Sequence, residues 1–218
     1  MNLFVIGDVH GCFHTFLKLL ERWDPKTEKL IQVGDLVDRG NFSPMALRLA
    51  FELQLAFKSQ TVFLMGNHES MMIKFLQGLD FSNHWGMNGG NQTLLQFERD
   101  NKDPMDYLDW LKNMPLFWEN KNVYISHAGL NTNARNPFDP QDKYSLLWNR
   151  QPLQNIGKLQ IIGHTPQLDG NAKYHEHGNY WNIDTAAAGG MYLTGIKLKR
   201  DGALIEIISV PTDMRDLR

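Results

Sequence analysis

Five short polar clusters stand out in the sequence because each directly follows an apolar run. They read GDVHG (7–11), GDLVDRG (34–40), GNHE (66–69), SHAG (126–129) and GHTP (163–166). Their Asp, Asn and His side chains are donors that divalent metal ions accept, and none of the clusters contains cysteine. One such cluster is usually a turn or a helix cap, but five with the same composition are not independent turns. They predict a metal site assembled from distant parts of the chain.

The spacing within the clusters fits this role. Asp8 and His10 are two residues apart, so an extended segment points both side chains the same way and lets them hold one ion. The glycines let the chain turn without a side chain crowding the site. The second cluster places Asp35, Asp38 and Arg39 at one strand end, where a strand that only packs a core needs no charge.

The strands that must position these clusters are visible as short apolar runs. We expect strands at 3–6, 29–33, 61–65, 123–126, 159–162 and 180–183. Near the C-terminus two further runs flank Arg200-Asp201-Gly202, which predicts a hairpin because Asp-Gly accepts the positive φ of a tight turn. Ligands of α/β sheets gather at the carboxyl ends of strands, and the clusters follow such ends.

Helices are expected between the first strands. Helical spacing occupies 13–23, and a second helix follows Ser43, a suitable N-cap with Pro44 in the first helical position. A third helix follows Glu69, and a fourth is expected at 104–111. The first half alternates strand and helix and the second half is mostly strand, which predicts an α/β fold whose later part is antiparallel.

Composition narrows the class of protein. The chain has 218 residues, 42% of them hydrophobic, which fits one domain over 1–218. A formal net charge of −2 gives no basic surface for a nucleic acid. The first apolar run soon meets Asp8, which excludes a signal peptide or membrane span there, and the single cysteine, Cys12, suits a reducing compartment. We expect a cytoplasmic protein without a membrane partner.

The five clusters, in this order, resemble the phosphoprotein phosphatase family of metallophosphoesterases, and most of all its lambda-type bacteriophage and bacterial serine/threonine phosphatases. NHWGMNGG (83–90), LLWNR (146–150) and NIDTAAAGG (182–190) extend the resemblance over nearly the whole chain. It implies a calcineurin-like α/β fold, a central β-sandwich flanked by helices, with the active site at the carboxyl ends of strands. One departure is Ala186, because the relatives more often read Asp-Thr-Gly there. We therefore assign Asp184 no catalytic role.

The resemblance also implies two divalent metal ions. The first ion's ligands would be Asp8, His10 and Asp35, and the second ion's ligands would be Asp35, Asn67, His127 and His164. Manganese is the expected metal, with iron or zinc as alternatives, since oxygen and nitrogen donors admit all three. Ions ~3.5–4 Å apart acidify a bridging water and clamp the attacking and leaving oxygens of an in-line displacement.

The remaining polar residues of the motifs have implied roles in the reaction. His68 resembles the general acid and Asp38 its orienting carboxylate, which opposes the loss of the proton that two nearby cations would otherwise cause. Arg39 and Arg150 would bind the phosphate, because a guanidinium matches two phosphate oxygens. For Arg150 alone, a surface salt bridge is the competing interpretation.

The resemblance implies a phosphatase of phosphoserine and phosphothreonine, extending to phosphotyrosine, with phosphoproteins or phosphopeptides as substrates. The alternative is a symmetrical diadenosine tetraphosphate hydrolase, a branch that usually reads GNHD where this chain has Glu69 and usually has a longer C-terminal part. A non-catalytic binding module should have lost ligands or the acid. The roles of His84 and of the His175/His177 pair are left open, and we expect His14 to pack or lie at the surface and Cys12 to be buried and inert.

Overall fold

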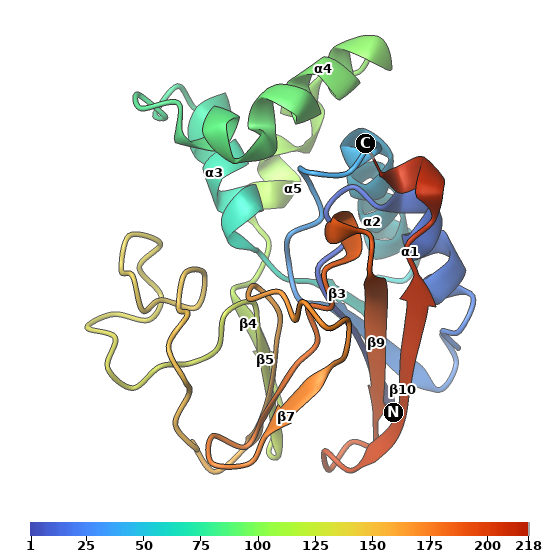
Figure 1. Cartoon of the computed structure of the whole chain (residues 1–218), viewed down its shortest axis with the longest axis vertical. Helices are drawn as coiled ribbons and strands as arrows, with labels where there is room; N and C mark the ends of the chain where they lie inside the picture. Colours follow the sequence, from blue (N-terminus) through green and yellow to red (C-terminus); the bar gives the residue numbers. More distant parts are fainter. Residues whose placement is uncertain (218) are drawn as a thin grey trace.

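The computed structural model describes residues 1–217, and its centre is a pair of five-stranded sheets (Figure 1). The first sheet has the order β10-β9-β1-β2-β3. Its strands are β1 (Asn2–Ile6), β2 (Glu28–Gln32), β3 (Thr61–Phe63), β9 (Tyr192–Leu198) and β10 (Leu204–Pro211). β1, β2 and β3 are parallel, and β9 and β10 form the expected antiparallel hairpin, with Gly202 at φ +92°.

The second sheet has the order β4-β5-β6-β8-β7. Its strands are β4 (Phe117–Glu119), β5 (Val123–Ser126), β6 (Leu159–Ile162), β7 (Lys173–His175) and β8 (Tyr180–Asn182). The expectation of an antiparallel later half is wrong for its centre, where β5, β6 and β8 are parallel. Long connections without helices, 127–158 and 163–179, make these crossovers. The two edge strands, β4 and β7, are antiparallel and were not expected.

Helices cover one face of the first sheet and extend above the sandwich (Figure 1). The α-helices are α1 (Phe13–Leu20), α2 (Ser43–Ala56), α3 (Asn67–Leu76), α4 (Asn91–Arg99) and α5 (Leu108–Lys112). A π-helical turn, η1 (Gly86–Gly90), leads into α4, and short 3₁₀ turns are η2 (Pro104–Tyr107), η3 (Ala187–Gly189) and η4 (Met214–Asp216). The helix expected at 104–111 is therefore η2 followed by α5, and α4 was not expected. Among residues 1–217, no helix has both the length and the apolar character that crossing a membrane requires.

Alternation along β1 shows why the sheets stack. Leu3 and Val5 face a core of aliphatic side chains between the two sheets, which includes Ile125 and Ile161. Phe4 and Ile6 face the opposite way and pack in the core under the helices. The first sheet is thus covered on both faces, and the expected α/β sandwich with flanking helices is confirmed.

The C-terminal segment fastens the first helix from far along the chain. No side chain adjacent to α1 caps its N-terminus. Instead the buried carboxylate of Asp216 accepts the backbone N–H groups of His14 (3.0 Å) and Thr15 (2.8 Å) and the hydroxyl of Thr15 (2.6 Å). A carboxylate at this end of a helix satisfies free N–H groups and meets the favourable end of the helix dipole. α1 follows the GDVHG cluster, so this contact also steadies the first part of the site.

We expect Asp216→Ala to lower the free energy of unfolding by about 2–3 kcal/mol, because it leaves buried donors at the start of α1 without an acceptor. Urea denaturation at pH 7 measures this loss. Asp109→Ala is the matched control, since its side chain is 97% exposed and its ion pair within the described residues is long, 3.9 Å to Lys112. Equal midpoints for the two variants would show that the cap contributes nothing.

Candidate metal centre

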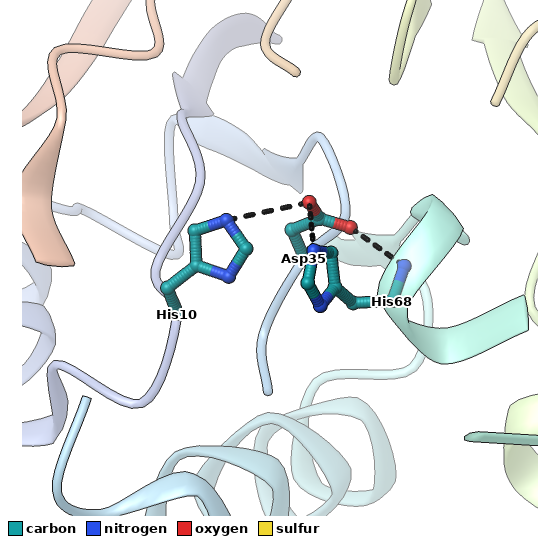
Figure 2. A group of neighbouring side chains, drawn as sticks. All are labelled: His10, Asp35 and His68. Carbon is teal, nitrogen blue, oxygen red and sulfur yellow. Dashed lines mark hydrogen bonds and ion pairs between the residues drawn. The ribbon is translucent and has the colours of Figure 1, made fainter. Parts of the chain in front are cut away.

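All five polar clusters meet where parallel strands of the two sheets end, and Asp35 lies at their centre. One oxygen of Asp35, Oδ2, lies 3.4 Å from Nε2 of His10 and 3.8 Å from Nε2 of His68 (Figure 2). The other, Oδ1, lies 3.4 Å from Nε2 of His127. The two oxygens of one buried carboxylate therefore face two different groups of histidines, which is the arrangement that a bridging ligand requires.

The donors expected for the second ion converge. Oδ1 of Asn67 lies 2.9 Å from Nε2 of His127 and 3.0 Å from Nδ1 of His164. Nδ1 of His127 is 3.1 Å from the carbonyl oxygen of Val33, to which it donates, so Nε2 is left with a lone pair for a metal. With Asp35, these side chains offer one carboxylate, one amide and two imidazoles around a single point, a donor set that fits a divalent ion.

The donors expected for the first ion are more spread out. His10 donates Nδ1–H to the carbonyl of Val37 at 2.9 Å, so its Nε2, which lies 3.4 Å from Oδ2 of Asp35, carries the lone pair. Asp8 accepts the backbone N–H of His164 with Oδ2 at 3.0 Å. Its Oδ1 is buried and has no hydrogen-bond partner among residues 1–217, so it is an available ligand atom. Asp8 is outside both compact groups of donors, and its role as a ligand stays a prediction.

Burial sets the charges of these groups in the direction a metal needs. It lowers the pKa values of His10, His127 and His164, which favours the neutral imidazoles whose lone pairs can bind a metal. Burial also opposes the ionisation of Asp35, but the four surrounding histidines outweigh it, His127 most, and hold the pKa of this carboxyl below its usual range. The centre thus favours an ionised carboxylate at Asp35 and the neutral form of His10, His127 and His164.

The backbone around these ligands is strained and is held by Glu69. His10, Asp35, Asp38, Arg39 and His164 all adopt left-handed backbone conformations, with φ between +45° and +73°. The fully buried carboxylate of Glu69 accepts the N–H groups of Asp35 (2.7 Å), Leu36 (2.8 Å) and Gly66 (2.9 Å). Burial and the charge of Asp35 raise the pKa of Glu69 to about 7. Sequence analysis gave Glu69 no structural role, although its place in GNHE is a signal for one.

The expected acid dyad is formed. Nδ1 of His68 lies 2.6 Å from Oδ2 of Asp38. Burial alone would lower the pKa of His68, but the charge of Asp35 and the hydrogen bond to Asp38 raise it above its ordinary value. Asp38 also accepts the indole N–H of Trp85 (2.9 Å) and the hydroxyl of Thr93 (2.6 Å). Sequence analysis did not find these two supports, which come from the unexpected π-helical turn region and α4.

Both predicted phosphate-binding arginines reach the site. Arg39 is exposed, and its guanidinium lies 2.7 Å from Nε2 of His10 and 3.1 Å from Nε2 of His68. Arg150, also exposed, donates to the carbonyl oxygen of His164 at 3.2 Å. The guanidinium groups therefore lie at the open side of the centre, where a phosphate would arrive, and their role in binding it stays a prediction.

The residues left open have simple surroundings. His84 stacks on Trp148 with centroids 5.9 Å apart, at the edge of the site, and His175 stacks on Tyr180 at 4.3 Å and is in neither candidate metal group within the described chain. Burial raises the pKa of Cys12 to about 12, which agrees with an inert thiol. His14 packs edge-on against Phe42, as expected for a packing residue.

Comparisons with known proteins agree with this geometry. Serine/threonine-protein phosphatase 1 of Salmonella typhimurium is 30% identical over 207 residues, which cover 88% of this chain and 90% of that protein. A symmetrical bis(5'-nucleosyl)-tetraphosphatase of Methylobacillus flagellatus is 33% identical over 132 residues, which cover 60% of this chain. That match spans only 44% of the tetraphosphatase.

The fold is likewise found in solved structures. A protein serine/threonine phosphatase from Saccharomyces cerevisiae with similarity to human phosphatase PP5 superposes with a TM-score of 0.65 at 18% identity, covering 98% of this chain and 80% of that one. A family model described as calcineurin-like phosphoesterase matches residues 1–194. With the motifs at the strand ends and the sandwich that carries them, this match shows that the chain belongs to the calcineurin-like metallophosphoesterase family.

Proposed function

We propose that the protein is a binuclear metal-dependent phosphatase. Its substrates would be phosphoserine and phosphothreonine in proteins, and also phosphotyrosine. The observation that carries this proposal is the buried dyad of His68 and Asp38 beside Asp35. Two divalent ions, manganese by preference, would activate water and polarise the phosphate when bound. We place the enzyme in the cytoplasm, with phosphoproteins as its partners.

Each side chain then has one task. Asp35 would bridge the ions, with Asp8 and His10 on one side and Asn67, His127 and His164 on the other. Arg39 and Arg150 would bind and orient the phosphate oxygens from the open side. His68 would donate the proton from Nε2, which lies 3.8 Å from Asp35 and faces the centre, while Asp38 holds Nδ1–H and so fixes the ring and its charge.

The leaving group favours an ester of an alcohol over a dinucleotide. A serine alkoxide is strongly basic, with a conjugate-acid pKa near that of water, ~15.7, and it needs a proton as it departs. A nucleotide leaves a tetraphosphate as a phosphate oxygen, whose pKa is near ~6, and it needs the proton far less. A buried acid with a raised pKa is therefore most useful for the first reaction.

We expect a phosphoserine peptide to be hydrolysed with a kcat/KM at least tenfold above that of diadenosine tetraphosphate, both with Mn²⁺ supplied. The serine alkoxide needs a proton as it leaves and the nucleotide needs it far less, and general acid catalysis contributes ~10²–10⁴-fold where it is needed. Phosphate release from the peptide and nucleotide products from the dinucleotide measure the two rates.

Activity should disappear with a strong chelator and return with Mn²⁺. A preference for the dinucleotide would favour the tetraphosphatase alternative, and activity in metal-stripped protein would exclude the two-ion mechanism.

Arg39→Ala and Arg150→Ala should each weaken inhibition by inorganic phosphate on the order of tenfold or more, because a charged hydrogen bond contributes ~1.5–3 kcal/mol. The Arg150 variant is easier to interpret than the Arg39 variant, because the hydrogen bond of Arg150 to the centre goes to a backbone carbonyl and not to an imidazole. Bound metal, measured by elemental analysis, should stay at the parent's level. Arg48→Ala is the control, because Arg48 pairs with Glu52 on an exposed helix face. Unchanged phosphate inhibition in both site variants would refute the assignment.

His68→Asn should slow hydrolysis of the phosphoserine peptide ~10²–10⁴-fold and that of nitrophenyl phosphate much less, because nitrophenolate leaves without a proton. Asp38→Asn should show the same trend more mildly, since it disorients the acid without removing it. The exposed His177→Asn is the control and should change neither rate. The measurement is kcat/KM for both substrates, with metal content verified. Equal losses on the two substrates would mean that His68 holds phosphate or metal instead of donating a proton.

A further inference from the structure

Asp184, which sequence analysis left without a role, lies in the centre. It follows β8 at the carboxyl end of the strand and is 2% exposed. Its Oδ1 accepts the backbone N–H of Ala186 at 3.1 Å. Its Oδ2 is buried and has no hydrogen-bond partner among residues 1–217. A buried carboxylate oxygen without a donor is costly, so something that the protein chain does not provide should compensate it.

The chain brings Asp184 close to the first predicted ligand. Gly7 lies so close to Ile183 that a Cβ at Gly7 would overlap the carbonyl oxygen of Ile183. The residues that follow these two, Asp8 and Asp184, therefore start from a point where the chain after β1 of the first sheet meets the chain after β8 of the second. Both carboxylates keep one buried oxygen without a partner.

The described part of the chain places no cation in direct contact with this pair. Neither Asp8 nor Asp184 forms an ion pair within 4.0 Å among residues 1–217. The arginines at the open side lie beside His10, His68 and the carbonyl of His164 instead. Two buried like charges that no cation contacts destabilise the folded protein. A cation between them would remove the repulsion and satisfy both free oxygens.

We propose that Asp184 is a third acidic residue of the metal centre, whose free oxygen strengthens the binding of the divalent ion held by Asp8. This inference depends on the proposed function only in taking the centre to bind such ions. With two divalent ions bound, the carboxylate of Asp184 would lower the net positive charge that the carboxylates of Asp8 and Asp35 leave in the site.

The backbone after Asp184 supports a positioning role. Ala186 has φ +59° and ψ +47°, a left-handed conformation that costs a residue with a Cβ roughly 1–2 kcal/mol. In that conformation its N–H holds Oδ1 of Asp184, which leaves Oδ2 buried and without a partner among residues 1–217. Strain of this kind persists only where the surroundings impose it, and here it fixes the carboxylate through one oxygen while the other stays available.

The test compares metal binding and metal-free stability of the parent with Asp184→Asn. The amide keeps the size of the side chain and an oxygen for the N–H of Ala186, and it removes the charge. We expect the Mn²⁺ ion held by Asp8 to bind ~10–100-fold less tightly, the usual effect of removing a group that supports metal ligands. Calorimetric titration of metal-free protein measures this. The same variant should melt at a higher temperature than the parent without metal and gain less from added Mn²⁺.

Opposite changes with and without metal distinguish the proposal from a structural role. If Asp184 only supports the fold, the metal-free variant melts lower and its Mn²⁺ affinity is unchanged, which would overturn the inference. Asp184→Glu keeps the charge and should retain Mn²⁺ affinity within about threefold; a loss as large as that of Asp184→Asn, in a protein that remains folded, would also overturn it. Asp169→Asn, at an exposed carboxylate near Lys173, is the control. A parent that binds no Mn²⁺ would instead contradict the proposed function.

Discussion

The geometry of the centre depends on one carboxylate, that of Asp35. It is buried among four imidazoles, in a left-handed backbone conformation, and its own Oδ1 accepts the N–H of His68 at 3.1 Å. Through that hydrogen bond it also caps the first turn of α3. One side chain thus links the strand end of β2, the start of the helix after β3 and both candidate groups of metal donors. Any displacement of Asp35 would disturb all of these at once.

Glu69 makes this position rigid. It lies in the same helical turn as Asn67 and His68, and it returns to the N–H groups of the loop that carries Asp35. Loop and helix therefore hold each other: Asp35 caps the helix, and Glu69 satisfies the loop. The strained conformations of Asp35 and Asp38 are tolerated because their N–H groups have fixed acceptors, Glu69 and the hydroxyl of Ser43.

Sequence reasoning worked best where one physical rule dominates. The six apolar runs became strands with ends within two residues, because burial of a short β-type run leaves few alternatives. The motifs also identified Asp35 and the His68–Asp38 dyad, whose closeness the structure shows. β4 and β7 were missed because edge strands of only three residues, FWE and KYH, are too short to show an alternating pattern. The parallel centre of the second sheet was missed because its crossovers contain no helix to mark them.

What the sequence could not provide were contacts made by side chains that look ordinary in it. Trp85 and Thr93 lie in a segment where the expected helices did not extend, and their hydrogen bonds to Asp38 depend on how η1 and α4 pack over the loop. Asp184 was set aside because the following Ala186 departs from the motif, whereas the structure shows that alanine in the conformation that a glycine would take. Ala186 therefore differs from the motif in residue type but keeps the left-handed backbone conformation that glycine favours.

The arrangement around His68 also separates two demands that conflict. Metal ligation requires neutral imidazoles, while acid catalysis requires an imidazole that keeps its proton close to cations. The chain meets the second demand with Asp38, and the other groups that donate to its carboxylate are an indole and a hydroxyl. Neither of these brings a positive charge, so His68 is the group that can share the charge of Asp38 through a hydrogen bond. Proton donation can therefore be adjusted at Trp85 or Thr93 through the acid, because among residues 1–217 neither side chain forms a hydrogen bond with a candidate metal ligand.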